Sequence, residues 1–319
     1  MRAVFLDYQS MKPEELDFER LAGATSEFVT HAATPPELVI ERIRKFDVVI
    51  LNKVKFERSH FEASPDLKLI LVSATGTDNV DKQAAVDHGV VVCNVAAYGT
   101  SSVSQHTLML MLMVATQAER YRNDVRASRW SKSSMFCLMD YPIIELEGRT
   151  LGIIGFGELG KAVGKLAEAF GMRVIVMGRD GIDYANNSER VSFDRLLEQS
   201  DFVSLHGLLT EKTQKMMNHE AFQKMKQGSY FINTARGALV DEDALCDALE
   251  SGHLAGAGLD VVVTEPPAEE SRLLKCTHPN LVITPHSAWA SLESRQRIVD
   301  IMQINLEAFV EGAPVNRVA

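Results

Sequence analysis

The chain has 319 residues, which is long for a single hydrophobic core, so we expect two domains. The composition, 46% hydrophobic and 24% charged residues, is typical of globular proteins that fold in water. A formal net charge of −10 argues against a surface that binds nucleic acid or anionic membranes, although it allows a local pocket for a small anion.

Short runs rich in β-branched residues alternate with amphipathic segments from end to end, a pattern typical of βαβ units. In the first hundred residues the runs are 3–7, 47–51, 68–74 and 90–94. Helical patterns lie between them, for example at 36–45 and 81–88. This part of the chain therefore predicts a parallel sheet with helices between its strands.

The stretch 89–118 contains no Asp, Glu, Lys or Arg and has to be considered as a membrane span. Polar residues interrupt it, and its unbroken apolar part, 108–115, is too short to cross a bilayer. We expect a buried helix there and no association with a membrane.

A second strand series follows that helix, at 150–155, 173–177, 201–206, 229–235, 256–262 and 281–286. Two series predict an α/β fold of two doubly wound, Rossmann-like domains, with the active site in the cleft between them. The final helical segment, 292–310, can return to the first domain. We therefore expect a discontinuous substrate domain, 1–100 plus 287–319, and a dinucleotide-binding Rossmann domain, 101–286.

The first strand of the second series ends in a glycine fingerprint, Gly155-Phe156-Gly157-Glu158-Leu159-Gly160. Such glycines allow a tight turn and the close approach of the main chain to a pyrophosphate at the helix N-terminus. Because the motif follows the first strand of its series, a dinucleotide site is favoured over glycines that serve packing alone.

The next strand ends in Gly178-Arg179, where an Asp or Glu would bind the ribose 2′-OH of NAD. The pair lacks the charge that would repel a 2′-phosphate and offers a guanidinium that can bind one, so NADP(H) is favoured over NAD(H). Two alternatives stay open. Asp180 can neutralise Arg179 or reach the ribose, and Arg179 can stack on the adenine of NAD.

Three side chains with useful chemistry follow later strands of this series, where ligands bind in open α/β sheets. Arg236 can fork onto a substrate carboxylate and polarise its carbonyl group. His286 can act as the acid/base that accompanies hydride transfer, with Glu265 stabilising the imidazolium. The alternatives are a surface ion pair of Arg236, a solvated loop residue for Glu265 and a structural histidine for His286.

Several ordered blocks resemble the D-2-hydroxyacid dehydrogenase family across almost the whole chain. They are the fingerprint, NTARGALVDE (233–242), the GAGLDVV strand followed by Glu265, TPHSAWAS (284–291), SATGTDNVD (73–81) and NVAAYGTSSVSQHT (94–107). The segment 136–160 is similar to the branch of glycerate dehydrogenases and hydroxypyruvate or glyoxylate reductases.

This resemblance implies a role for each candidate. Arg236 would bind the substrate carboxylate and keto oxygen, His286 would protonate that oxygen, and Glu265 would pair with His286. The carboxylate would also bind the main-chain amides of one loop, Ala74, Thr75 and Gly76. Asn52 and Lys53, which follow an earlier strand, are weaker candidates for the same cleft, and Lys53 can equally be a solvated loop lysine.

The cofactor contacts follow from the same resemblance. The fingerprint and the end of the next strand would hold the pyrophosphate and the ribose. A later loop would border the adenine half of the cofactor, and the strand ends near Arg236 and His286 would border the nicotinamide half. The full set is Gly155, Gly157, Glu158, Leu159, Gly160, Gly178, Arg179, His206, Gly207, Thr213, Thr234, Ala235, Arg236, Asp260, His286 and Ala288. Asp260 can alternatively cap its own turn.

The implied activity is reduction of a short 2-oxo acid, hydroxypyruvate or glyoxylate, to the D-2-hydroxy acid by NADPH or NADH. A homodimer joined through the dinucleotide-binding domain is expected, and the apolar helix at 108–115 is compatible with a dimer face or with ordinary core. The alternatives are a phosphoglycerate-type dehydrogenase and a non-catalytic NAD(H)-sensing corepressor. A formate dehydrogenase is disfavoured because no glutamine precedes His286.

The cysteines form neither a CxxC pair nor a cluster with histidines at zinc spacing, so we expect no metal. They are Cys93, Cys137, Cys246 and Cys276. The first residues lack the pattern of a signal peptide, and a reducing cytoplasm is therefore the expected location.

Overall fold

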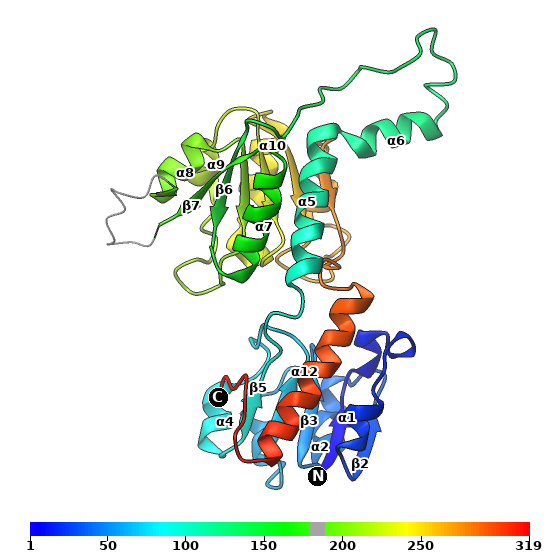
Figure 1. The fold of residues 1–319 in the computed structure, drawn as a ribbon, viewed down its shortest axis with the longest axis vertical. Coiled ribbons are helices and arrows are strands. Elements are labelled where there is room, and N and C mark those ends of the chain that lie inside the picture. Colours follow the sequence, from blue (N-terminus) through cyan, green and yellow to red (C-terminus); the bar gives the residue numbers. More distant parts are fainter. Residues whose placement is uncertain (179–188) are drawn as a thin grey trace. The chain divides into compact units, whose positions relative to one another are not determined.

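The computed structural model describes residues 1–178 and 189–319. The chain divides into two compact units: unit 1 contains Met1–Gly99 and Ala290–Ala319, and unit 2 contains Thr100–Trp289. In Figure 1 the first and last parts of the chain, blue and red, accordingly belong to the same unit. The boundaries expected from the sequence, after residues 100 and 286, differ from these by one residue and three residues.

Unit 1 is built on a five-stranded parallel sheet in the order β2-β1-β3-β4-β5. Its strands are β1 (Arg2–Phe5), β2 (Glu27–Thr30), β3 (Val48–Leu51), β4 (Leu69–Val72) and β5 (Val91–Cys93). The central strands β3 and β4 are buried along their whole length, which explains why they are continuous apolar runs in the sequence.

Helices pack on both faces of this sheet. One core cluster joins alternate strand residues to α2 (Val39–Ile43), α3 (Arg58–Glu62) and α4 (Lys82–Asp87). The helix α12 (Leu292–Val310) is not part of this cluster and packs against β4 and α1 (Glu19–Gly23). The loops also contain the 3₁₀ turns η1 (Tyr8–Met11), η2 (Pro13–Glu15) and η3 (Pro36–Leu38).

Unit 2 contains a seven-stranded parallel sheet in the order β12-β11-β10-β9-β6-β7-β8. The strands are β6 (Thr150–Ile154), β7 (Arg173–Met177), β8 (Arg190–Val191), β9 (Phe202–Leu205), β10 (Ser229–Asn233), β11 (Leu254–Leu259) and β12 (Leu281–Ile283). From β6 the chain adds β7 and β8 on one side of the sheet, and it then crosses to add β9 to β12 on the other side. Ligands of open α/β sheets bind at such a switch point in the strand order, here between β6 and β9.

The seven-stranded sheet is also covered on both faces. One core cluster packs it against α8 (Phe193–Gln199), α9 (His219–Lys224) and α10 (Glu242–Glu250), and another against α5 (Thr100–Thr116) and α7 (Glu158–Ala169). The remaining elements of the described chain are α6 (Ala118–Arg126), α11 (Arg272–Lys275) and the 3₁₀ turn η4 (Gly237–Leu239).

The predicted fold class of two parallel-sheet α/β domains is confirmed. Among the elements that were not predicted from the sequence are β2, β8 and α6. Both strands are short, β8 lies at a sheet edge, and β2 is only partly buried, so neither produces an apolar run. Within the described residues, no helix is both long enough and apolar enough to span a bilayer.

Candidate active site

The glycine fingerprint forms the turn between β6 and α7. Gly155 has φ +96°, and a Cβ there would lie 2.4 Å from the main-chain nitrogen of Gly207. A Cβ on Gly160 would lie 2.2 Å from the carbonyl oxygen of Gly155. Gly157 differs, because a Cβ there would meet no atom within 4 Å. Two glycines therefore serve the close packing of the turn, and the third leaves open space at the N-terminus of α7.

That open space fits the pyrophosphate of a dinucleotide. The first N–H groups of α7, from Glu158 and Leu159, have no partner within the helix and can bind an anion. The Glu158 carboxylate accepts a hydrogen bond from Thr100 Oγ1 at 2.9 Å. The main chain and the glycines of this turn thus match what a dinucleotide requires.

The adjacent strand β7 ends at Met177, and Gly178 continues the pairing with β8 by donating its N–H to the carbonyl of Val191 at 2.8 Å. The expected cofactor residue Arg179 and its neighbour Asp180 lie outside the described residues. The position of Gly178 offers no side chain at this end of the strand.

The loop after β9 contains three of the residues expected at the adenine half. The His206 Nε2 atom is 2.9 Å from Ser204 Oγ, and its buried Nδ1 atom has no hydrogen-bond partner in the described part of the chain. Burial lowers the pKa of His206 to about 4. Thr213 Oγ1 donates to the carbonyl of Leu208 at 2.8 Å, so its hydroxyl holds its own loop.

Arg236 follows β10 in a turn that the strand itself stabilises. Asn233 Nδ2 donates to the carbonyl of Arg236 at 3.0 Å, and Asn233 Oδ1 accepts the N–H of Ala235 at 2.9 Å. The preceding Thr234 is buried, and its hydroxyl is 2.9 Å from Thr107 Oγ1 on α5. The carboxylates considered as surface partners of Arg236 have other contacts: Asp241 pairs with Lys215, and Glu242 accepts the N–H of Val263.

The loop that carries His286 is fixed by the buried carboxylate of Asp260. Oδ1 accepts the N–H of Ser287 at 2.9 Å and the hydroxyl of Thr284 at 2.6 Å, while Oδ2 accepts the N–H of Ala288 at 2.9 Å. Asp260 is 1% exposed. Both of its oxygens hold the loop after β12 rather than its own turn after β11, and its contact with the cofactor stays a prediction.

The structure brings His286 and Glu265 together. His286 Nδ1 is 2.5 Å from Glu265 Oε2, and the second oxygen, Oε1, accepts the N–H of Val262 at 3.1 Å. His286 itself has φ +52°, and its N–H donates to the carbonyl of Asp260 at 2.8 Å. Within the described residues, the Nε2 atom of His286 has no hydrogen-bond partner. The ring is thus oriented through Nδ1, which leaves Nε2 for a ligand.

Arg236 and His286 lie at equivalent places beyond matched strands. Asn233, Leu259 and Ile283 are aligned across β10, β11 and β12, and Arg236 and His286 each follow their aligned residue by three positions. Since strands are about 4.8 Å apart, two spacings put the aligned strand ends Asn233 and Ile283 about 10 Å from each other, and both loops begin at this edge of the sheet. A small acid with one carboxylate and one carbonyl can fit between two side chains at such a distance.

The loop after β4 in unit 1 contains the amides expected to bind a carboxylate. Thr75 Oγ1 donates to the carbonyl of Val95 at 2.7 Å, and the carbonyl of Thr75 accepts the amide of Asn94 at 2.7 Å. In the described chain, the N–H groups of Ala74, Thr75 and Gly76 donate to no acceptor. The loop therefore presents main-chain donors that an anion can use.

Asn52 and Lys53 follow β3, and they differ in exposure. Asn52 is 5% exposed, and its amide donates to Ser10 Oγ at 3.1 Å. Lys53 is exposed, and its N–H donates to Asp7 Oδ2 at 2.6 Å. Of the two, Lys53 is the residue whose side chain can reach a ligand in solution.

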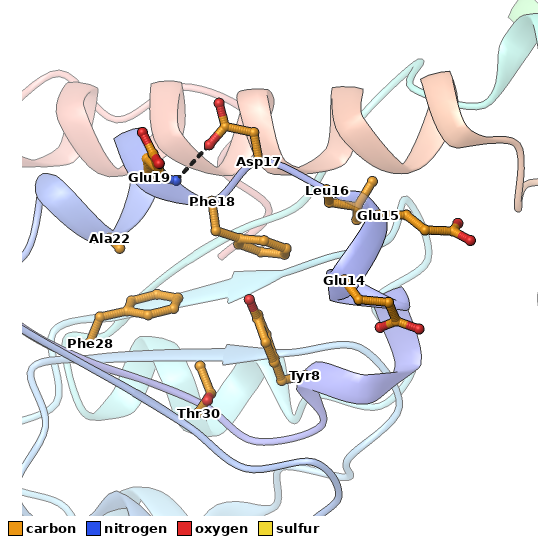
Figure 2. Close-up of a pocket in the computed structure, with 10 residues that line it drawn as sticks. All are labelled: Tyr8, Glu14, Glu15, Leu16, Asp17, Phe18, Glu19, Ala22, Phe28 and Thr30. Carbon is orange, nitrogen blue, oxygen red and sulfur yellow. Dashed lines mark hydrogen bonds between the residues drawn. The ribbon is translucent and has the colours of Figure 1, made fainter.

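A groove on unit 1 contains none of the predicted site residues (Figure 2). The rings of Tyr8, Phe18 and Phe28 face its hollow, and the acidic side chains of Glu14 and Glu15 point away from them (Figure 2). Glu15 is occupied by ion pairs with Lys12 and Arg295. We assign no ligand to this groove.

Several residues that organise the site were missed in the sequence. His106 Nε2, on α5, is 2.9 Å from Thr284 Oγ1 and 3.4 Å from Asp260 Oδ1, and Ser102 donates to the carbonyl of Ala288 at 2.6 Å. The only signal was that polar residues interrupt an otherwise apolar helix. No group of histidine, cysteine or acidic residues suited to a metal occurs among the described residues.

Comparison with known proteins agrees with this geometry. Residues 108–288 match the model of the D-isomer specific 2-hydroxyacid dehydrogenase NAD-binding domain. The chain is 42% identical to a glycerate dehydrogenase of Methylorubrum extorquens, covering 99% of this chain and 98% of that protein. It is 40% identical to a hydroxypyruvate reductase of Blautia hydrogenotrophica, covering 99% of each.

A solved structure of an acyclic imino acid reductase in complex with NADPH and D-Arg superimposes with a TM-score of 0.88 at 26% identity, covering 100% of both chains. Three observations support the same family: the match of the family model, the extent of the similar sequences and the glycine turn. The protein is therefore an oxidoreductase with a nicotinamide cofactor, and the chain belongs to the D-isomer specific 2-hydroxyacid dehydrogenase family.

Proposed function

We propose that the protein reduces a short 2-oxo acid, hydroxypyruvate or glyoxylate, to the corresponding 2-hydroxy acid, of D configuration where that carbon is chiral. The observation that carries this proposal is the contact between His286 and Glu265 in the same unit as the glycine turn. Glycerate dehydrogenase and hydroxypyruvate reductase, the names of the two relatives, refer to the product and the substrate of one such reduction.

When bound, the nicotinamide supplies the hydride. The protein's own residues bind and orient the oxo acid and supply the proton. Nδ1 of His286 donates to Glu265, so the ring presents Nε2 to the keto oxygen and transfers a proton to it as negative charge develops there. Arg236 binds the carboxylate and polarises the carbonyl group. The free amides of Ala74, Thr75 and Gly76 add donors for the same carboxylate.

The experiment that tests the proposal is steady-state oxidation of NADPH and of NADH by the purified protein, each with hydroxypyruvate and with glyoxylate. We expect turnover with at least one oxo acid, and the D enantiomer of glycerate as the product from hydroxypyruvate. Binding of the cofactor without turnover would favour a nucleotide sensor. No turnover of either oxo acid, together with reduction of NAD⁺ or NADP⁺ by a phosphorylated 2-hydroxy acid, would favour a phosphoglycerate-type enzyme.

We further propose a preference for NADPH over NADH. Gly178 supplies no carboxylate at the end of β7, and Arg179 follows it in the sequence. Arg190 on β8, paired with Val176 of β7, has its guanidinium 5.7 Å from the centroid of the Phe156 ring in the fingerprint. The test is titration of NADPH and NADH with Arg179→Ala, which should weaken NADPH more. Equal losses for both cofactors would contradict the preference.

We infer that the protein is a homodimer joined through unit 2, mainly outside the apolar part of α5, of which Met109 is the exposed residue. Leu110, Met111, Val114 and Ala115 of that helix are buried in the core of unit 2. Exposed apolar side chains occur instead on α6 and the segment after it, which extend away from the sheet of unit 2 (Figure 1). They are Val125, Trp130, Met135, Phe136, Met139 and Ile143.

A reducing cytoplasm is the proposed location of the enzyme. All four cysteines are free thiols, and two of them, Cys93 and Cys246, are buried. Free buried thiols are typical of proteins kept in a reducing compartment, where structural disulfides are rare.

A further inference from the structure

The loop that follows β3 is held by one buried carboxylate. Asp7 is 7% exposed and lies after β1, the neighbour of β3 in the sheet. Its Oδ1 accepts the N–H of Asn52 at 2.8 Å, and its Oδ2 accepts those of Lys53 and Val54 at 2.6 and 3.3 Å. One side chain thus binds three successive N–H groups directly beyond the strand.

A second side chain holds the carbonyl groups of the same loop. Asn79 Nδ2 donates to the carbonyl of Asn52 at 3.1 Å and to that of Val54 at 2.9 Å. The main chain from 52 to 54 is therefore fixed on its donor side by Asp7 and on its acceptor side by Asn79. Its conformation depends on these two side chains, because the strand has already ended at Leu51.

The residue after Asp7 belongs to a cluster of aromatic rings. The ring of the next residue, Tyr8, packs against Phe18 with 4.8 Å between ring centroids and against Phe5 with 5.4 Å (Figure 2 shows Tyr8 and Phe18). Burial raises the pKa of the Asp7 carboxyl, and the three N–H groups oppose that effect. A carboxyl group out of water is unfavourable without such partners, so Asp7 and the loop depend on each other.

Lys53 lies beside the loop proposed to take the substrate carboxylate. Leu51 of β3 is aligned with Val72 of β4, so Lys53 and Ala74 each lie two residues beyond matched positions. The two strands are about 5 Å apart, and the main chain at Lys53 therefore runs next to the free amides that begin at Ala74. An exposed lysine that starts at this place can add a positive charge to those donors.

We propose that Asp7 is a positioning residue for substrate binding, which fixes the main chain of Lys53 so that the ammonium group of Lys53 meets the carboxylate of the oxo acid. The inference rests on the proposed function. In this arrangement Asp7 acts through Lys53 and touches neither the substrate nor the cofactor.

The test compares Asp7→Asn, Lys53→Ala and the double variant, with KM for hydroxypyruvate, kcat and the Kd of NADPH as readouts. Asparagine keeps the shape but sets an NH₂ donor against a main-chain N–H. Lys53→Ala should raise KM about tenfold, the usual effect of losing a charged hydrogen bond, and Asp7→Asn about fivefold. In the Lys53→Ala background, Asp7→Asn should add less than about twofold, because the two residues act as one unit.

Asp47 at the other end of β3 offers a matched control. Its carboxylate also accepts a main-chain N–H, from Arg2 at 2.8 Å, and pairs with Lys68 at 3.1 Å. Asp47→Asn should lower the melting temperature and leave KM unchanged. If both Asp47→Asn and Asp7→Asn raised KM equally, the effect would be one of general stability and the inference would be overturned.

Asn79→Ala loosens the same loop from its carbonyl side, and it replaces Asp7→Asn as the test if that variant does not fold; it too should raise KM. The inference is overturned if the folded Asp7→Asn or Asn79→Ala protein has an unchanged KM. It is likewise overturned if Lys53→Ala has no effect, or if the effects of Asp7→Asn and Lys53→Ala multiply fully. A wild-type protein that turns over no oxo acid would refute the proposed function itself, before any variant is compared.

Discussion

At the scale of single residues, the buried carboxylate of Asp260 organises the loop of the proposed proton donor, His286. Asp260 fixes the loop of His286 through three hydrogen bonds, and Glu265 then orients the imidazole. This division of roles explains how a half-buried loop outside the strands can hold the His286 ring within hydrogen-bond distance of Glu265. Hydrogen bonds to a buried carboxylate are stronger than those at the surface, so the loop is held firmly.

Glu265→Gln is expected to lower kcat for the oxo acid about 100-fold while the cofactor still binds. The amide keeps the size of the side chain but loses the charge that stabilises the protonated imidazole. The measurement is kcat together with the Kd of NADPH from its fluorescence. An unchanged kcat would remove Glu265 from the mechanism, and loss of NADPH binding would indicate a structural role instead.

His206 should make the stability of the protein depend on pH. Burial lowers its pKa from 6.5 to about 4, so between these values the unfolded chain binds a proton that the folded protein does not. The free energy of unfolding should therefore fall as the pH is lowered through this window, by up to about 3 kcal/mol. Denaturant unfolding of wild type and His206→Gln between pH 4.5 and 6.5 tests this. Parallel pH profiles of the two proteins would contradict it.

At the scale of elements, the sequence predicts what depends on local pattern. The central strands and α12 are continuous apolar or amphipathic segments, and their predicted places agree with the structure. The contact of His106 with Asp260 could not be predicted, because it joins residues 154 positions apart through the packing of α5 on the sheet. The short strand β2 has the pattern of a polar edge rather than of a core. Arg236 and His286 could be predicted as site residues because each follows a strand, and the carboxyl ends of parallel strands meet at one edge of the sheet.

Two glycines in the turn between β6 and α7 should have different roles, one in cofactor binding and the other in the stability of the fold. Gly157→Ala should fold normally but raise the Kd of NADPH at least about tenfold, because the methyl group enters the open space at the helix N-terminus. Gly155→Ala should lose more than about 2 kcal/mol of stability, because of its positive φ and the contact with Gly207. Thermal unfolding and cofactor titration of both variants distinguish the two roles, and normal NADPH binding by Gly157→Ala would argue against a cofactor at this turn.

At the scale of the whole molecule, the segment around Phe136 contains the most exposed large apolar side chain among the described residues. Phe136 is 86% exposed and Met139 is 81% exposed. Apolar side chains that extend from the body of a protein commonly mark an interface between subunits. This surface lies in a segment without regular secondary structure, so no periodic pattern in the sequence indicated it, and the apolar residues of α5 pointed instead to a helix that is part of the core.

The double change of Phe136 and Met139 to Asp should convert a dimer into a monomer. Sedimentation equilibrium of the wild type should give twice the 35.3 kDa mass of the chain, and the variant should give that mass once. Val310→Asp is the control, because Val310 is 62% exposed and lies in unit 1. A wild-type monomer, or a variant that stays dimeric, would contradict the proposed interface.

The role of His286 in proton transfer is tested by comparing the wild type with His286→Ala. The measurement is the initial rate of NADPH or NADH oxidation with hydroxypyruvate at saturating cofactor. If Nε2 of His286 supplies the proton, the wild type turns over, and the variant loses a factor of about 10² to 10⁴ in rate while its Kd for the cofactor is unchanged. A variant that reduces hydroxypyruvate at the wild-type rate would show that His286 is not the proton donor.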